Sequence, residues 1–152
     1  MATEFDKYAA KGNEFLHMLA NDLHIPDDKA LRILRAVLHA TRNHLAIGES
    51  LQVLSQLPMA LKAVYVDQWH LSPGFKRIHH VKQFLDEIRA CDKGLAGYDF
   101  GNDEAAIKAI KAVYRGLHYY LSDGEFDDMI AVMPAELKKL ISDSIGKGSM
   151  AM

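Results

Sequence analysis

The sequence has little of the chemistry that most often signals a function: its 152 residues include one cysteine, four prolines and one tryptophan. A single cysteine, Cys91, cannot close an intrachain disulfide, which excludes a disulfide-stapled scaffold. No run of eighteen apolar residues is present, so the sequence predicts no membrane-spanning helix. The N-terminal stretch is charged and lacks the apolar region of a secretory signal. We therefore expect a reduced, cytoplasmic protein.

The sequence also has no large excess of positive or of negative residues. Eighteen Lys and Arg stand against 20 Asp and Glu, which gives a formal net charge of -2, and the two halves of the chain carry equal shares of it. Proteins that bind duplex nucleic acid usually have a strong basic excess, so the charge does not favour that class. The apolar fraction of 49% and the charged fraction of 25% are typical of a globular domain with a sizeable core.

An internal repeat with an offset of 76 positions is the clearest feature that the sequence does contain. Residues 30–65 align with residues 106–141 without a gap. A shorter match, EFLHML at Glu14 with QFLDEI at Gln83, extends the similarity toward the start of each half. Nine aligned pairs are identical: Ala30/Ala106, Ala36/Ala112, Val37/Val113, Leu45/Leu121, Gly48/Gly124, Glu49/Glu125, Pro58/Pro134, Leu61/Leu137 and Lys62/Lys138.

Both copies have the periodicity of amphipathic helices, with apolar residues recurring every three or four positions, as at Leu31, Leu34 and Leu38. Pro58 and Pro134 interrupt helical runs, so each is expected to break its run or to begin a new helix. No stretch alternates like a strand. The predicted helical segments are roughly 12–24, 28–46, 49–56, 58–68, 80–91, 103–121, 124–132 and 134–144.

Side chains suited to capping stand at several predicted helix starts. Asp27 or Asp28 can cap the second segment, and Asn102 or Asp103 can cap its later counterpart. The run from Ser122 to Glu125 has the spacing of a capping box. The glycine-rich stretch around GLAGYDFGND is predicted to be a longer loop in the second half.

These patterns predict an all-α protein: a single compact helical domain built from two similar four-segment helical repeats packed on one core. A half of this length buries little surface alone, so the two halves are expected to share that core. The first repeat covers residues 12–68 and the second covers 80–144, with an ordered connector over 69–79 and a flexible tail over 145–152.

Three strings carry a resemblance to a known family: LRAVLHATRNHL, LPMALKAVYVDQW and LSDGEFDDMIAVMPAELKKL. With their Leu-Pro and Met-Pro steps and the Gly-Glu pair, they resemble the bacterial family known as domain of unknown function 2267, over about Glu14 to Ile141. The resemblance implies an all-helical, cytoplasmic bacterial protein. It implies no activity and no catalytic residues.

Motifs for catalysis and metal binding are missing. The sequence has no Gly-x-Ser-x-Gly nucleophile elbow, no phosphate-binding loop and no His-Glu-x-x-His zinc motif. The pairs Glu14/His17 and Asp67/His70 have the carboxylate-x-x-His spacing, but eight histidines produce about one such pair by composition alone. We therefore predict no catalytic residue, no metal and no cofactor, and we favour a protein that is not an enzyme.

Basic stripes on two helices are the one candidate binding feature that both halves share. Such stripes can hold phosphates, an acidic protein face or RNA. They also arise without any ligand, because an amphipathic helix needs a solvated face. The stripes consist of Arg32, Arg35, His39 and Arg42 in the first half and of Lys108, Lys111, Arg115 and His118 in the second.

Aromatic residues suggest an interface. They are too numerous around the connector and the later helix end for all of them to lie inside an amphipathic domain, and exposed aromatic patches often mark contact surfaces. The interface prediction, for a homodimer or another protein partner, concerns Trp69, Phe75, Tyr119 and Tyr120.

Three functional interpretations remain from the sequence. The favoured one is a small non-enzymatic interaction or regulatory module that acts through its surfaces. The alternative is a ligand-binding or enzymatic domain with a pocket between the two repeats. Nucleic-acid binding through the basic stripes is a weaker alternative, and the sequence names no substrate, partner or pathway.

Overall fold

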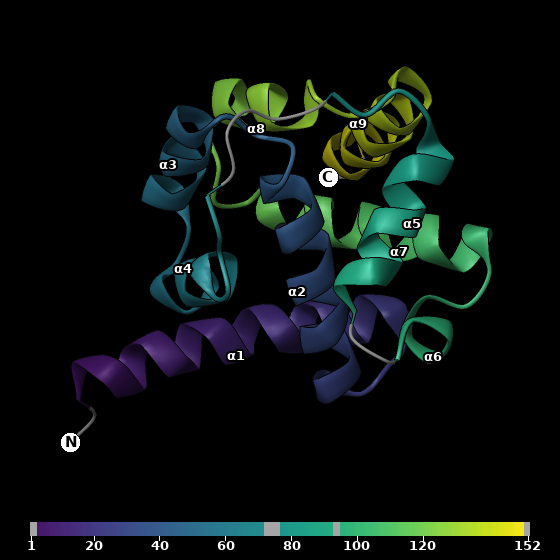
Figure 1. Ribbon diagram of the computed structural model, residues 1–152. Coiled ribbons are helices and arrows are strands. Elements are labelled where there is room, and N and C mark those ends of the chain that lie inside the picture. Colours follow the sequence, from purple (N-terminus) through teal and green to yellow (C-terminus); the bar gives the residue numbers. More distant parts are fainter. Residues whose placement is uncertain (1–2, 72–76, 93–94, 151–152) are drawn as a thin grey trace.

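The computed structural model describes residues 3–71, 77–92 and 95–150, and for residues 146–150 it describes the helix alone. Over these ranges the chain forms nine α-helices and no strand, which confirms the all-α class (Figure 1). None of the described helices combines the length and apolar composition needed to cross a bilayer. The helices are α1 (Glu4–Leu23), α2 (Asp27–Arg42), α3 (Ile47–Gln56), α4 (Met59–Val66), α5 (Val81–Cys91), α6 (Ala96–Phe100), α7 (Asp103–Leu117), α8 (Asp123–Ile130) and α9 (Ala135–Met150).

The helices of the two halves begin at matching positions. The starts of α2, α3 and α4 at Asp27, Ile47 and Met59 recur 76 positions later as the starts of α7, α8 and α9. The predicted proline breaks are confirmed in the first half, where α3 ends before Pro58 and α4 begins after it. That the two sets of helices form equivalent three-dimensional repeats stays a prediction.

Three elements differ from the sequence prediction. Helix α1 begins at Glu4 rather than near residue 12, because Thr3 accepts a hydrogen bond from the Asp6 backbone and Asp6 accepts one from Thr3. Helix α6 forms where a loop was predicted, and five residues are too short to show a helical period. Helix α9 extends through Met150, into the predicted flexible tail.

Caps were predicted with mixed success. Asn102 and Ser122 accept hydrogen bonds from the backbone of Ala105 and Glu125, as the sequence indicates. Helix α2 instead begins directly after Pro26, which supplies no side-chain cap. The predicted aspartate cap of α2 is therefore wrong, and Asp27 lies within the first turn.

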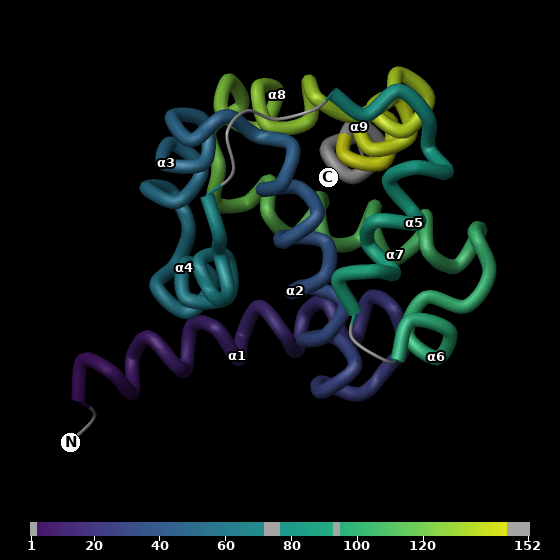
Figure 2. The backbone as a smooth tube through the Cα atoms, in the orientation of Figure 1, coloured from purple at the N-terminus to yellow at the C-terminus, as the bar shows by residue number. Residues whose placement is uncertain are grey.

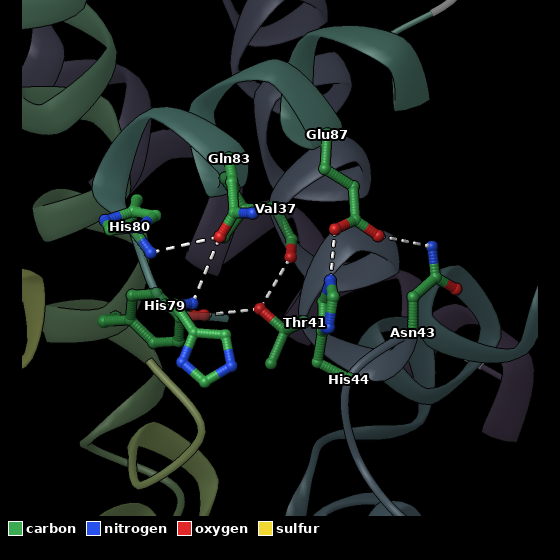
Figure 3. Close-up of polar contacts among 9 residues, drawn as sticks. Val37, Thr41, Asn43, His44, His79, His80, Gln83 and Glu87 are labelled. Atoms are coloured by element: carbon green, nitrogen blue, oxygen red, sulfur yellow. Dashed lines mark hydrogen bonds and ion pairs between the residues drawn. The ribbon is translucent and has the colours of Figure 1, made fainter. Parts of the chain in front are cut away.

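The centre of the molecule is formed by α2 and α7, with α1 crossing below them and α3, α8 and α9 above them (Figures 1 and 2). A single hydrophobic cluster draws side chains from both halves. The buried Thr41 hydroxyl of α2 donates to the Val37 carbonyl (Figure 3). The same hydroxyl is also hydrogen-bonded to the hydroxyl of Tyr114 on α7. Nearby, Glu87 of α5 binds Asn43 and His44 just beyond the end of α2 (Figure 3).

Helices α1 and α4 approach each other closely at a glycine. A Cβ atom placed on Gly12 would lie 2.5 Å from the Cβ atom of Ala60. Real carbon atoms do not pack at this distance, so a side chain at position 12 would force α1 and α4 apart.

We predict that Gly12→Ala lowers the free energy of unfolding by about 1–3 kcal/mol, because overpacking outweighs the gain in helix propensity. Gly48→Ala is the matched control, since a Cβ atom there meets nothing within 4 Å. The control should be neutral or stabilising by up to about 1 kcal/mol. Urea denaturation followed by circular dichroism measures both, and equal effects of the two substitutions would contradict the close approach.

Candidate functional site

The first basic stripe, on α2, meets the end of α4. Arg42 is buried, and Nη1 of its guanidinium donates to the carbonyl oxygens of Tyr65 and Asp67, the latter at 2.8 Å. Nη2 donates to the carbonyl oxygen of Gln68 at 3.0 Å. His39, one turn earlier and also buried, lies with its Nε2 atom 2.8 Å from the carbonyl oxygen of Val64.

These bonds satisfy the carbonyls at the C-terminal end of a short helix. The last carbonyl groups of a helix have no partner within it, and the helix dipole makes that end negative. A buried guanidinium supplies both the hydrogen bonds and the compensating charge. A purely solvated face is therefore the wrong interpretation of this stripe, because Arg42 and His39 are only 6% and 5% exposed.

Arg32, at the other end of the stripe, forms an ion pair across the molecule. Its Nε and Nη2 atoms donate to the two carboxylate oxygens of Asp99, at 2.9 and 3.0 Å. The short helix α6 places Asp99, which is buried, against α2. A second carboxylate, Asp28, lies one turn before Arg32 and 3.4 Å from it. This bidentate geometry is the strong form of an arginine–carboxylate pair.

Asp92, directly after α5, lies next to this ion pair. Burial, the hydrogen bond with Asp99 and the negative charge of Asp99 raise the pKa of Asp92 to about 7. Although burial acts to raise the pKa of Asp99 as well, hydrogen bonds from Arg32 and Asp92 lower it overall. Below pH 7 the arrangement is therefore an ionised Asp99 that accepts from Arg32 and from a protonated Asp92.

A cavity of about 340 Å³ opens beside these groups. Its walls come from α2, from the segment after α4 and from the end of α5, so both halves of the sequence contribute to it. The cavity is lined by Arg32, Arg35, His39, Asp67, Gln68, Cys91 and Asp92. The cavity therefore lies between segments of the two halves, and that it holds a ligand stays a prediction.

Two polar atoms in the cavity wall lack a hydrogen-bond partner in the described part of the chain. One is Nε of Arg35, a donor, and the other is Oδ2 of Asp92, an acceptor. The nearest carboxylate to Arg35 is that of Asp67, with Oδ2 at 3.9 Å from Nε, which is too long for a hydrogen bond. Buried polar groups without partners are costly, and they are found where a ligand completes the bonding.

His39 and Cys91, two further groups of the wall, are both shifted toward their neutral forms. Burial, together with the charges of Arg42 and Arg35, lowers the pKa of His39, although the bond to Val64 opposes this shift. Because a carbonyl can only accept, the His39 proton is assigned to Nε2, which leaves Nδ1 as an acceptor. Burial and the nearby Glu87 raise the pKa of the Cys91 thiol.

The second basic stripe, on α7, has different surroundings, and its Arg115 lines a separate cavity of about 430 Å³ between α1 and α7. Arg115 donates to Asp22 on α1 and to Ser144 on α9, at 2.7 Å for the serine. His118 contacts Asp123 at 3.2 Å and packs against the Phe126 ring. Lys108 is exposed and Lys111 is half-buried. The two stripes therefore have the same sequence pattern but different surroundings.

The four predicted interface aromatics have different positions. Trp69 packs edge-on against the buried Tyr65, and Tyr120 packs against Phe15, so both are partly buried. Tyr119 is 75% exposed. Phe75 lies outside the described residues. Their role in an interface stays a prediction.

Five residues of the site were not predicted from the sequence: Asp67, Gln68, Cys91, Asp92 and Asp99. Asp99 reaches Arg32 across 67 positions of sequence, and no periodicity links α2 to a five-residue helix. Gln68 adopts a positive φ of 58°, a backbone conformation that the residue type glutamine does not predict. The internal repeat was the only feature of the sequence that pointed to this site, since it singled out Arg35 and its neighbours on α2.

Comparison with known proteins agrees with this all-helical architecture. The model of a family described as uncharacterised conserved protein, DUF2267, matches residues 12–140. The chain therefore belongs to the DUF2267 family. No curated protein matches the chain.

We predict that Arg42→Met lowers the free energy of unfolding by about 3 kcal/mol, because it leaves buried carbonyls of the α4 end without a donor. Lys108→Met, an exposed position of the other stripe, should change stability by less than about 0.5 kcal/mol. Urea denaturation measures both variants. A loss of less than 0.5 kcal/mol in Arg42→Met would show that the hydrogen bonds of Arg42 at the α4 end contribute little to stability.

We further predict that Asp92→Asn changes the pH dependence of stability. An unfolded aspartate titrates near pH 4, whereas the pKa of Asp92 in the folded protein is about 7. Between these values the folded state holds a proton that the unfolded state has lost, so the Asp92 contribution to stability falls as pH rises. Relative to the wild type, Asp92→Asn should therefore become more stable from pH 5 to pH 8.

The difference between the two proteins is the quantity to measure, because the lowered pKa of His39 acts on the wild type in the opposite direction. Urea titrations at four pH values between 5 and 8 supply it. A difference that stays constant over this range would show that Asp92 is ionised throughout.

Proposed function

We propose that the protein is a non-enzymatic binding module whose cavity beside α2 takes a small molecule with an anionic group and a hydrogen-bond donor. The observation that carries the proposal is the Nε atom of Arg35, a buried donor without a partner in the cavity wall. A carboxylate or phosphate oxygen is its natural acceptor. A hydroxyl or ammonium group on the same molecule would donate to the unpartnered Oδ2 atom of Asp92.

The chemistry of the wall supports binding more than reaction. A nucleophile needs a base within hydrogen-bond reach, and the Cys91 thiol has a raised pKa and forms no hydrogen bond with a base among the described residues. The Nε2 atom of His39 is engaged by the Val64 carbonyl, so this imidazole is held as a structural donor. Arg32 forms a bidentate pair with Asp99, whereas Asp67 Oδ2 lies 3.9 Å from Nε of Arg35, too far for a hydrogen bond, which leaves Arg35 as the arginine of the wall that can bind an anion.

The other expectations from the sequence are compatible with this proposal. A bacterial, cytoplasmic protein with a regulatory role fits a ligand-responsive module, and a homodimer or another partner would transmit the response. Nucleic-acid binding is disfavoured, because Arg32 and Arg42 of the α2 stripe bind other parts of the protein, so that the stripe does not form an open cationic surface. Tyr119, the most exposed of the described interface candidates, is the position to probe for a partner.

The proposal is tested by titration of four small probes, followed through backbone amide chemical shifts. Glycolate and glycine each combine a carboxylate with a donor, acetate has the carboxylate alone, and ethanolamine has the donors without an anion. Glycolate and glycine should shift amides of α2 and of the α5 end, with weaker shifts from acetate and none from ethanolamine. Arg35→Gln should reduce the affinity for glycolate at least tenfold, equivalent to about 1.4 kcal/mol.

Lys111→Gln is the matched control, because Lys111 occupies the position 76 residues after Arg35 and does not line the cavity. It should bind glycolate as the wild type does. Equal binding by the wild type and Arg35→Gln, or shifts confined to surfaces away from α2 and α5, would refute the proposal.

A further inference from the structure

Two glutamates that the repeat places at equivalent positions meet in the folded protein. Glu49 and Glu125 are 76 positions apart, and each lies in the first turn of its helix, α3 or α8. Helices α3 and α8 pack against each other (Figure 1). A further hydrogen bond joins these helices, from the Ser122 backbone to the side chain of Gln56 at 2.7 Å.

A third carboxylate completes the cluster. One oxygen each from Glu49, Glu125 and Asp128 lie within 4.8 Å of one another. Glu125 is only 9% exposed, Glu49 is half-buried and Asp128 is exposed, so the group is closed on the protein side and open at Asp128. Asp128 follows Glu125 by three residues on α8, which puts both on one face of that helix.

No cationic side chain of the described residues neutralises the cluster. Among the described residues, no lysine, arginine or histidine forms an ion pair with any of the three carboxylates. Oε1 of Glu49 and Oε1 of Glu125 are both buried without a hydrogen-bond partner there. Below them, the buried Tyr65 hydroxyl is bonded to Ser50 at 2.7 Å. Carboxylates this close repel each other unless a proton or a cation lies between them.

We propose that Glu49, Glu125 and Asp128 bind one hard divalent cation, such as Ca²⁺, Mg²⁺ or Mn²⁺, which joins α3 to α8. The ligand set consists of carboxylate oxygens, which these cations prefer, and it contains no thiolate or imidazole to favour zinc or copper. The open side at Asp128 leaves room for water molecules that complete the coordination shell. The cation joins the two halves of the sequence at the positions where both carry a Gly-Glu pair.

The test uses the full chain after treatment with a chelator. Titration with CaCl₂, MgCl₂ and MnCl₂ is followed by isothermal calorimetry and by thermal unfolding at pH 7.5. At least one of the three ions should bind with one equivalent per chain. At a concentration one hundred times its dissociation constant, that ion should raise Tm by about 5 °C.

Substitutions identify the site. Asp128→Asn, at an exposed position that should not impair folding, and Glu125→Gln should each weaken binding at least tenfold. Asp127→Asn is the matched control, since Asp127 is an exposed neighbour on α8 outside the cluster, and it should bind as the wild type does. Binding that survives both Asp128→Asn and Glu125→Gln would place the ion elsewhere and overturn the proposal.

A proton shared by the glutamates is the competing explanation. Burial, the hydrogen bond with Glu49 and the charges of Glu49 and Asp128 raise the pKa of Glu125 to about 7. Burial, together with the charges of Glu49 and Glu125, raises the pKa of Tyr65 to about 12, so that Tyr65 stays protonated. A bound cation must displace the Glu125 proton, so its affinity should fall from pH 8 to pH 6. If none of the three ions binds at pH 8, the pair holds a proton and the proposal is wrong.

Discussion

The four carbonyl oxygens at the end of α4 need donors, and α2 supplies them through Arg42 and His39. A helix of eight residues cannot satisfy its own last turn, and a buried end without partners would cost several kcal/mol. The guanidinium spans three carbonyls because its donors form a rigid fork. This contact fixes the segment that follows α4, and that segment is one wall of the cavity. The position of Arg35 relative to Asp67 depends on it.

The two halves use one sequence pattern in different ways. Arg42 binds the end of α4, whereas His118, its counterpart 76 positions later, contacts Asp123 and Phe126. Arg35 lines the cavity and Lys111 does not. Glu49 and Glu125 are an exception to this difference between the halves, because the packing of α3 on α8 brings these two identical residues together. Similar helices can thus be retained for packing while single positions on them take on separate roles.

Periodicity was sufficient to predict eight of the nine helices, since amphipathic runs and proline steps are local signals. Helix α6 was missed for the same reason, because five residues between glycines carry no period. The stripe on α2 was located correctly, but its role depends on what packs against it. Nothing near Arg32 in the sequence indicates Asp99, and nothing near Arg42 indicates the carbonyl groups that it binds. A sequence specifies which residues share a helical face, whereas the partner of that face depends on tertiary packing.

The arginines of α2 therefore divide into two kinds: Arg42 and Arg32 donate several hydrogen bonds within the protein, although Nε of Arg42 is itself unpartnered, whereas Arg35 donates no hydrogen bond to the described residues. This division is tested most directly by NMR of the arginine Nε–H groups in ¹⁵N-labelled protein during addition of glycolate. The Arg35 signal should move with the added ligand, while the Arg42 signal should stay in place and exchange slowly with solvent. Movement of the Arg42 signal together with that of Arg35, or an Arg35 signal that does not respond while other cavity signals do, would contradict the separation of structural and binding roles on this helix.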